Sequence, residues 1–311
     1  MVQKPHWLPE LVDADVTILL RANGLDVEGV TDLIGRALAE DLDGGVDVTT
    51  IATVPSGQYS TMDLTARKPG VVAGAIVAAA VFDLVSNHEA DVEILVADGM
   101  PVEAGQVIVR VTGHTLALLT GERTALNIMC HLSGIATATA AWAQALEGTK
   151  AQVRDTRKTT PGMRRLEKYA VRCGGGVNHR MSLSDAALVK DNHVVAAGGV
   201  VNAFAAVRRK FPEVAIEVEV DSLEQLHEVV DAGADCVLLD NFSLEQMREA
   251  VEWTAGRARL EASGGLTIAD AKAVAATGVD FIAVGAITHS APILDIGADL
   301  HDAADPKKAS D

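Results

Sequence analysis

The chain has 311 residues, a formal net charge of −17 and only 3% aromatic residues. The net negative charge argues against partners such as nucleic acid or anionic membranes, and the scarcity of aromatic rings argues against stacking surfaces for single strands. The longest apolar run, residues 71–82, is shorter than the ~20 residues of a membrane span, and the chain starts without an apolar signal core, so we expect a soluble cytoplasmic protein.

The first part of the chain predicts an N-terminal α/β sandwich domain, which we place at residues 1–134. A helix is expected over residues 30–41 and a long one over residues 121–146. Strands are expected at 61–66, 71–73, 92–96 and 107–111. The C-terminal tail, residues 290–311, is expected to pack back on this domain, and its polar end, residues 302–311, is expected to fray.

The second part, residues 135–289, alternates short apolar runs with amphipathic helices. Ser222 and Ser243 each begin S-L-E-Q, and Thr267 begins T-I-A-D, which are signals for helix starts. Six apolar runs are expected to be strands: 151–153, 187–189, 215–220, 236–239, 259–262 and 281–284. This rhythm is typical of a β/α barrel or of a doubly wound sheet.

Polar residues after every one of these runs favour the barrel. An open doubly wound sheet concentrates its site at one switch point, whereas a barrel uses the carboxyl ends of all its strands. Since only six strands are clear, we predict an incomplete, open β/α barrel of TIM type as the catalytic domain.

A basic segment interrupts this acidic chain. Residues 154–190 contain nine lysines and arginines and three acids, together with Gly174, Gly175 and Gly176. Arginine pairs with carboxylates at two points, lysine neutralises phosphate, and glycine lets backbone approach closely. The segment therefore predicts a site for small, highly charged anions.

Several residues at strand ends are candidates for that site. Arg157 and Lys158 would be a solvated loop if isolated, but convergence with Lys190 favours function. Glu219 and Asp240 are read either as ion-pair partners of the basic residues or as a Mg²⁺ site. The loops with Ser263, Gly264, Gly265 and Gly285 are a weak signal for phosphate binding at helix starts. His179 is read as structural or as an anion contact, and Arg123 as a surface arginine.

Nine segments together make the chain resemble the quinolinate phosphoribosyltransferase family, over roughly residues 30–300. They are G-E-R-T-A-L-N from Gly121, D-T-R-K-T-T-P-G from Asp155, L-E-K-Y-A-V from Leu166, G-G-G-x-N-H-R from Gly174, L-x-K-D-N-H from Leu188, E-V-E-V from Glu217, L-L-D-N from Leu238, E-A-S-G-G from Glu261 and V-G-A-I-T-H-S from Val284. Residues 1–27 and the tail have the least support.

The resemblance implies phosphoribosyl transfer from phosphoribosyl pyrophosphate (PRPP) to quinolinate, with decarboxylation, in NAD biosynthesis. It also implies a homodimer with shared active sites, in which Arg123 reaches the neighbour's barrel. Together with the charges of the substrates, it assigns quinolinate to Arg123, Arg157, Lys158, His179, Arg180 and Lys190. It assigns PRPP to Lys158, Glu219, Asp240, Ser263, Gly264, Gly265 and Gly285, with Mg²⁺ at Glu219 and Asp240. Lys158, Lys190, Glu219 and Asp240 are the expected catalytic residues.

Two alternatives remain open at this point. The first is a related phosphoribosyltransferase that acts on nicotinate or another aromatic acid. The second is a non-catalytic sensor of small anions on the same scaffold, against which the full set of charged strand-end residues argues.

Overall fold

The computed structural model describes residues 5, 7–9 and 12–302, so most of the tail expected to fray lies outside the described part of the chain. Two compact units form, each described by itself. The first consists of residues up to 137, residues 165–174 and residues from 292 onward, and the second of residues 138–164 and 175–291. Residues 165–174, which the sequence placed in the second domain, belong to the first unit.

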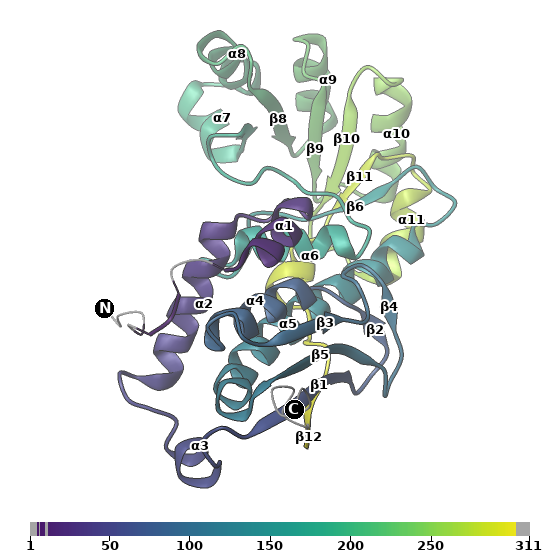
Figure 1. Cartoon of the computed structure of the whole chain (residues 1–311). Coiled ribbons are helices and arrows are strands. Elements are labelled where there is room, and N and C mark those ends of the chain that lie inside the picture. Colours follow the sequence, from purple (N-terminus) through teal and green to yellow (C-terminus); the bar gives the residue numbers. More distant parts are fainter. Residues whose placement is uncertain (1–4, 6, 10–11, 303–311) are drawn as a thin grey trace. The chain divides into compact units, whose positions relative to one another are not determined.

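The first unit contains an antiparallel sheet in the order β12-β1-β5-β3, covered by helices (Figure 1). Its strands are β1 Tyr59–Ala66, β3 Asp91–Ile94, β5 Val107–His114 and β12 Ile296–Asp302, with the small pair β2 Gly70–Val71 and β4 Pro101–Val102. Its helices are α1 Ala14–Ala22, α2 Val27–Leu42, α3 Val48–Thr53, α4 Ala75–Val85, α5 Thr115–Ala145 and α6 Arg164–Cys173. Helix α5 belongs to this unit up to Thr137, and α6 belongs to it from Arg165 onward.

Helix α4 is apolar except for Asp83 and is fully buried, which makes it the centre of this unit's core. Helix α6 is held by polar contacts instead. The buried Glu167 bonds His131 of α5 at 2.8 Å, and the Tyr169 hydroxyl donates to Asp98 at 2.7 Å. Burial raises the pKa of Asp98. These hydrogen bonds, together with the buried side chains Leu166, Ala170 and Val171, hold α6 in the first unit despite its basic sequence.

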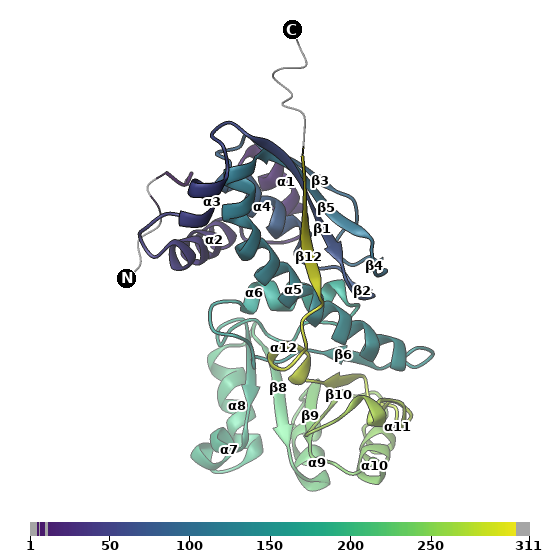
Figure 2. The same ribbon diagram turned by 90° about the horizontal axis from the view of Figure 1, so that it is seen from below.

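Strand β12 lies beside β1 in the first unit, although 229 residues of sequence separate Ala66 from Ile296, its partner (Figure 2). The returning chain passes directly over Gly134 on α5. A Cβ at Gly134 would come within 2.2 Å of the Pro292 carbonyl oxygen. The Leu294 amide also donates to the Cys130 carbonyl at 3.0 Å. Only glycine therefore permits this close crossing of helix and return segment.

The second unit contains a parallel sheet of six strands in the order β6-β11-β10-β9-β8-β7 (Figure 1). The strands are β6 Gln152–Arg154, β7 Ala186–Val189, β8 Ala215–Val220, β9 Cys236–Asp240, β10 Arg259–Ser263 and β11 Phe281–Ala283. They coincide with the six predicted runs. Because β6 and β7 are both edge strands, the sheet is an incomplete barrel, as predicted. At its open side the segment around Val177 bonds to β6.

Helices of the second unit begin at the predicted caps. The Ser222 and Ser243 side chains accept from the backbone three residues onward, at the starts of α9 and α10. Thr267 begins a short 3₁₀ turn, residues 268–270, that leads into α11. The helices are α7 Asp191–Ala197, α8 Val200–Lys210, α9 Leu223–Asp231, α10 Leu244–Thr254, α11 Ala271–Ala275 and α12 Ala286–His289. Among the described residues, every helix is too short or too polar to span a bilayer.

Candidate active site

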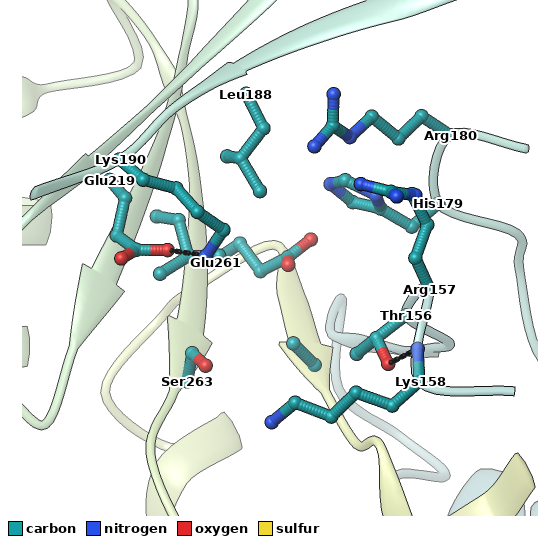
Figure 3. A pocket seen from close by; sticks show the side chains of 12 residues that line it. Thr156, Arg157, Lys158, His179, Arg180, Leu188, Lys190, Glu219, Glu261 and Ser263 are labelled. Atoms are coloured by element: carbon teal, nitrogen blue, oxygen red, sulfur yellow. Dashed lines mark hydrogen bonds and ion pairs between the residues drawn. The ribbon is translucent and has the colours of Figure 1, made fainter. Parts of the chain in front are cut away.

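The carboxyl ends of the six parallel strands surround a pocket of about 310 Å³ in the second unit. Its walls combine five cationic or imidazole side chains with a few apolar ones, and Figure 3 shows how they face one another. The lining residues are Thr156, Arg157, Lys158, His179, Arg180, Leu188, Lys190, Glu219, Leu238, Glu261, Ser263 and Ala283. Side chains from all six strand ends therefore meet at one place, which is the expected active face of a β/α barrel.

Arg157 and Arg180 lie together on one side of this pocket (Figure 3). The Nε atoms of both are buried and have no hydrogen-bond partner among the described residues. Burial, and next the charge of Arg157, lower the pKa of Arg180. Two like charges with unused buried donors are costly unless an anion joins them. The charge and the unused donors on this side of the pocket suit a small anion such as a carboxylate.

Lys190 and Glu219 form an ion pair on the opposite side, with Nζ and Oε2 2.5 Å apart. The Lys190 side chain remains 45% exposed, so its ammonium is also open to a ligand. The Lys190 backbone N–H donates to Nδ1 of His193 at 2.9 Å at the start of α7. Glu219 therefore forms an ion pair with a basic residue, which is one of the two roles that the sequence allowed for it.

A buried network of charges lies beneath the pocket. His179 Nε2 is 2.5 Å from Glu217 Oε2, and Arg154 Nη1 is 2.6 Å from Glu261 Oε2 and 3.5 Å from Glu217 Oε1. Glu217 and Glu261 are 6% and 1% exposed. Buried carboxylates of this kind need cationic or hydrogen-bonding partners, and Arg154 and His179 contact them. The network therefore fixes the imidazole that lines the pocket.

The pKa values of the two buried acids, Glu217 and Glu261, shift in opposite directions. Burial, and next the charge of Glu217, raise the pKa of Glu261 to about 8. Burial also opposes ionisation of Glu217, but the hydrogen bond and charge of His179 and the charge of Arg154 outweigh it and lower the pKa of Glu217. The surroundings therefore favour ionisation of Glu217 and oppose ionisation of Glu261.

A second pocket, of about 490 Å³, adjoins the first and shares Thr156, Lys158, Ser263 and Ala283 with it. It is lined by glycine-rich loops rather than by arginine. The remaining lining residues are Asp240, Asn241, Gly264, Gly265, Leu266, Val284, Gly285, Ala286 and His289. Backbone N–H groups in such loops suit phosphate. Lys158 stands at the junction of the two pockets.

The loops that carry these side chains are held by buried hydrogen bonds. The fully buried Asp155 accepts from the His179 amide at 2.8 Å and from Asn178 Nδ2 at 2.6 Å. The Thr288 hydroxyl of α12 donates to the Lys158 carbonyl at 2.8 Å. The 156–158 and 178–180 loops are thus anchored to each other and to the barrel before any ligand binds.

The structure brings together all the predicted site residues of the second unit. Arg123 is the exception, since it lies on α5 in the first unit with a 61% exposed side chain and does not line either pocket. The basic segment also divides. Four of its nine basic residues line the pockets, namely Arg157, Lys158, Arg180 and Lys190. Lys168 and Arg172 belong to α6 in the first unit, and Arg154 pairs with buried acids.

Sequence reasoning missed the buried residues Arg154, Glu217 and Glu261 and the pocket residue Asn241. A signal for two of them existed. Glu217 and Glu261 each precede a predicted site residue, Glu219 and Ser263, by two positions on a strand. Alternate residues of a strand face the same side. An acid at that spacing inside an apolar run therefore pointed to the same pocket.

The structure offers two kinds of place for a cation. The group His179, Glu217 and Glu261 has metal-ligand atoms within 4.8 Å of one another, but Arg154 already neutralises it. Glu219 and Asp240 stand instead at the ends of neighbouring strands and line the first and second pockets respectively. Asp240 makes no ion pair with any described residue. Mg²⁺ prefers such oxygens when substrate phosphates complete its shell.

Comparison with known proteins identifies this architecture. Residues 47–133 match the N-terminal domain of quinolinate phosphoribosyl transferase, and residues 135–299 match its C-terminal domain. A Mycobacterium leprae protein named nicotinate-nucleotide pyrophosphorylase [carboxylating] is 52% identical over 279 residues, which cover 88% of this chain and 98% of the relative. A probable enzyme of the same name from Bacillus subtilis is 39% identical, with coverage of 86% and 92%.

Solved structures agree with the sequence relatives. The crystal structure of NadC from Streptococcus pyogenes is 40% identical with a TM-score of 0.86, and the match covers 90% of this chain and 99% of that one. The nicotinate-nucleotide pyrophosphorylase from Francisella tularensis is 38% identical with a TM-score of 0.84, and the match covers 90% and 98%. Both the sequence and the fold are therefore similar over nearly the full length of these proteins.

Proposed function

Because the chain belongs to the quinolinate phosphoribosyltransferase family, we propose that it transfers the phosphoribosyl group of PRPP to quinolinate. The products are nicotinate mononucleotide, diphosphate and carbon dioxide, on the route to NAD. One observation carries the proposal: a cationic pocket with unused buried guanidinium donors adjoins a glycine-lined pocket, and Lys158 lines both. A dicarboxylate acceptor and a phosphorylated donor would thus meet at one residue.

The first pocket is the proposed quinolinate subsite. Quinolinate carries two adjacent carboxylates, and Arg157 and Arg180 supply planar donors on one side while Lys190 supplies an ammonium on the other. His179, held by Glu217, lies beside the two arginines (Figure 3). Leu188 and Leu238 give the pyridine ring apolar walls. A neutral aromatic compound would leave these cations unpaired, so the pocket selects an acid.

The second pocket is the proposed PRPP subsite. Ser263, Gly264, Gly265 and Gly285 would hold the 5′-phosphate through hydroxyl and backbone donors. Glu219 and Asp240 would hold Mg²⁺, which supplies charge neutralisation of the diphosphate when bound. Lys158, at the junction, would contact the diphosphate or the nearer carboxylate of quinolinate.

The chemistry at this junction is mainly positioning and electrostatics. As diphosphate leaves, positive charge develops on the ribose, and the carboxylates of Glu219 and Asp240, at the ends of neighbouring strands, would stabilise it. The pyridine nitrogen, oriented by the arginines, then forms the bond to the ribose carbon. The resulting pyridinium withdraws electrons from the neighbouring ring carbon, so the carboxylate there leaves as carbon dioxide and a proton replaces it.

Arg123 fits this scheme only as a contribution from a second copy. It is exposed on α5 and lines neither pocket of its own chain. We therefore include in the proposal a homodimer in which each active site receives Arg123 from the partner. That arrangement adds a cation to the quinolinate subsite.

The direct test supplies the purified protein with PRPP, Mg²⁺ and quinolinate and measures nicotinate mononucleotide, diphosphate and carbon dioxide. We expect the three products in equal amounts, and no product with nicotinate in place of quinolinate. Product from nicotinate but not quinolinate would favour the related phosphoribosyltransferase. Absence of diphosphate release with every aromatic acid, in protein that binds quinolinate, would favour the anion sensor.

A further inference from the structure

Asn241 occupies an unusual backbone position in the second pocket. It directly follows Asp240 at the end of β9 and has a φ of +56°. Side chains other than glycine rarely adopt this left-handed conformation, and asparagine tolerates it better than most. The conformation turns the chain sharply away from the strand toward Ser243, which begins α10. A residue kept there at a conformational cost invites a functional explanation.

The backbone of Asn241 is fixed by the neighbouring strand. Its N–H donates to the Ser263 carbonyl at 3.0 Å, which extends the register that pairs Asp240 with Ser263. The position therefore cannot relax without breaking the last rung between β9 and β10.

The side chain of Asn241 is also fixed. Its Nδ2 donates to Asp240 Oδ2 at 2.8 Å. On the other side, Gly264 leaves just enough room, since a Cβ at that position would come within 2.3 Å of Asn241 Oδ1. The amide is thus held between a glycine of one proposed phosphate loop and the carboxylate of Asp240.

We propose that Asn241 is a positioning residue that orients the Asp240 carboxylate toward the Mg²⁺–diphosphate part of PRPP. The proposal rests on the proposed function. The hydrogen bond engages Oδ2 of Asp240, and Asp240 lines the second pocket, so its other carboxylate oxygen, which no described residue bonds, can bind a ligand.

The test compares Asn241→Gly and Asn241→Ala with wild type. Both lose the amide, but only glycine relieves the left-handed backbone. The KM for PRPP at saturating quinolinate and the Mg²⁺ concentration for half-maximal turnover should rise about five- to tenfold in both variants, less than loss of a buried hydrogen bond to a charged group would give, because this bond is exposed. Quinolinate affinity, measured by calorimetry, should stay within about twofold of wild type.

Asn87→Ala is the matched control, because Asn87 is also left-handed, with a φ of +55°, and lies in the first unit outside both pockets. It should leave both kinetic constants unchanged. If the backbone alone mattered at Asn241, Asn241→Gly would recover wild-type constants, which would overturn the proposal. A parallel loss of quinolinate affinity would also overturn it, since that would indicate collapse of the whole site.

A double-mutant cycle identifies the residue through which Asn241 acts. In an Asp240→Asn background, Asn241→Gly should change the KM for PRPP by less than about twofold, because the carboxylate it orients is already absent. Full additivity of the two changes would contradict a role through Asp240. A wild-type protein without nicotinate mononucleotide formation would instead refute the proposed function, before any variant is compared.

Discussion

Replacing Arg157 by alanine separates ligand binding from folding in the cationic pocket. The Arg157 Nε is buried without a partner among the described residues, and the guanidinium lies beside Arg180. Its proposed role is to bind a quinolinate carboxylate. Loss of one hydrogen bond between charged groups costs about 1.5–3 kcal/mol. Arg157→Ala should therefore weaken quinolinate binding by at least about tenfold.

The same substitution should not destabilise the unliganded protein. The charge of Arg157 helps to lower the pKa of Arg180, so its removal relieves repulsion between two half-buried cations. We expect the free energy of unfolding of Arg157→Ala to equal or exceed that of wild type. The binding loss would then reflect the site alone.

Arg154→Ala is the matched contrast, because this arginine is three residues earlier and pairs with Glu217 and Glu261. Removing one partner of a buried ion pair costs about 3–5 kcal/mol, so this variant should unfold at clearly lower denaturant concentration. Calorimetry with quinolinate and urea unfolding measure both quantities for each variant. Unchanged quinolinate affinity in folded Arg157→Ala protein would refute the assignment of this side of the pocket.

Three further outcomes are expected. Glu219→Gln should raise the Mg²⁺ concentration needed for turnover and nearly preserve quinolinate binding, whereas an unchanged magnesium titration would reduce Glu219 to the ion-pair partner of Lys190. Mixing inactive Arg123→Ala and Lys158→Ala proteins should restore activity, up to about a quarter of wild type by random pairing; no recovery in proven heterodimers would exclude a shared site. The raised pKa of Glu261, about 8 against an ordinary 4.5, means that the folded protein binds the extra proton between these values. The free energy of unfolding should therefore fall from pH 4.5 to 8, by on the order of a few kcal/mol, and urea unfolding of Glu261→Gln should show a flatter profile.

Most of the second unit could be predicted from sequence because its signals are local. Each strand is a short apolar run, and the capped helices begin at Ser222, Ser243 and Thr267. The polar residue after each strand lies at the active face of the barrel. The site residues at strand ends were accessible for the same reason. Parallel strands bring their carboxyl ends together whatever the intervening sequence is.

The parts that sequence did not reveal depend on contacts between distant residues. Glu217 and Glu261 sit inside apolar strands, and their burial is acceptable because Arg154 from β6 pairs with both and His179 bonds Glu217. Helix α6 belongs to the first unit through the pairs His131–Glu167 and Tyr169–Asp98. The weak alternation of I-G-A-D-L-H-D in β12 would not by itself predict a strand, which pairing with β1 creates.

The pairing of β12 with β1 determines the order in which the chain can complete its two units during synthesis. The edge of the first unit's sheet is occupied by residues 296–302, at the end of the chain, while the whole second unit lies between residues 138 and 291. During synthesis, every strand of the barrel therefore leaves the ribosome before the last strand of the first unit's sheet. Until then β1 presents an unpaired edge, which is a template for aggregation. Nascent chains stalled before residue 296 should accordingly depend on chaperones more than chains that are a few residues longer.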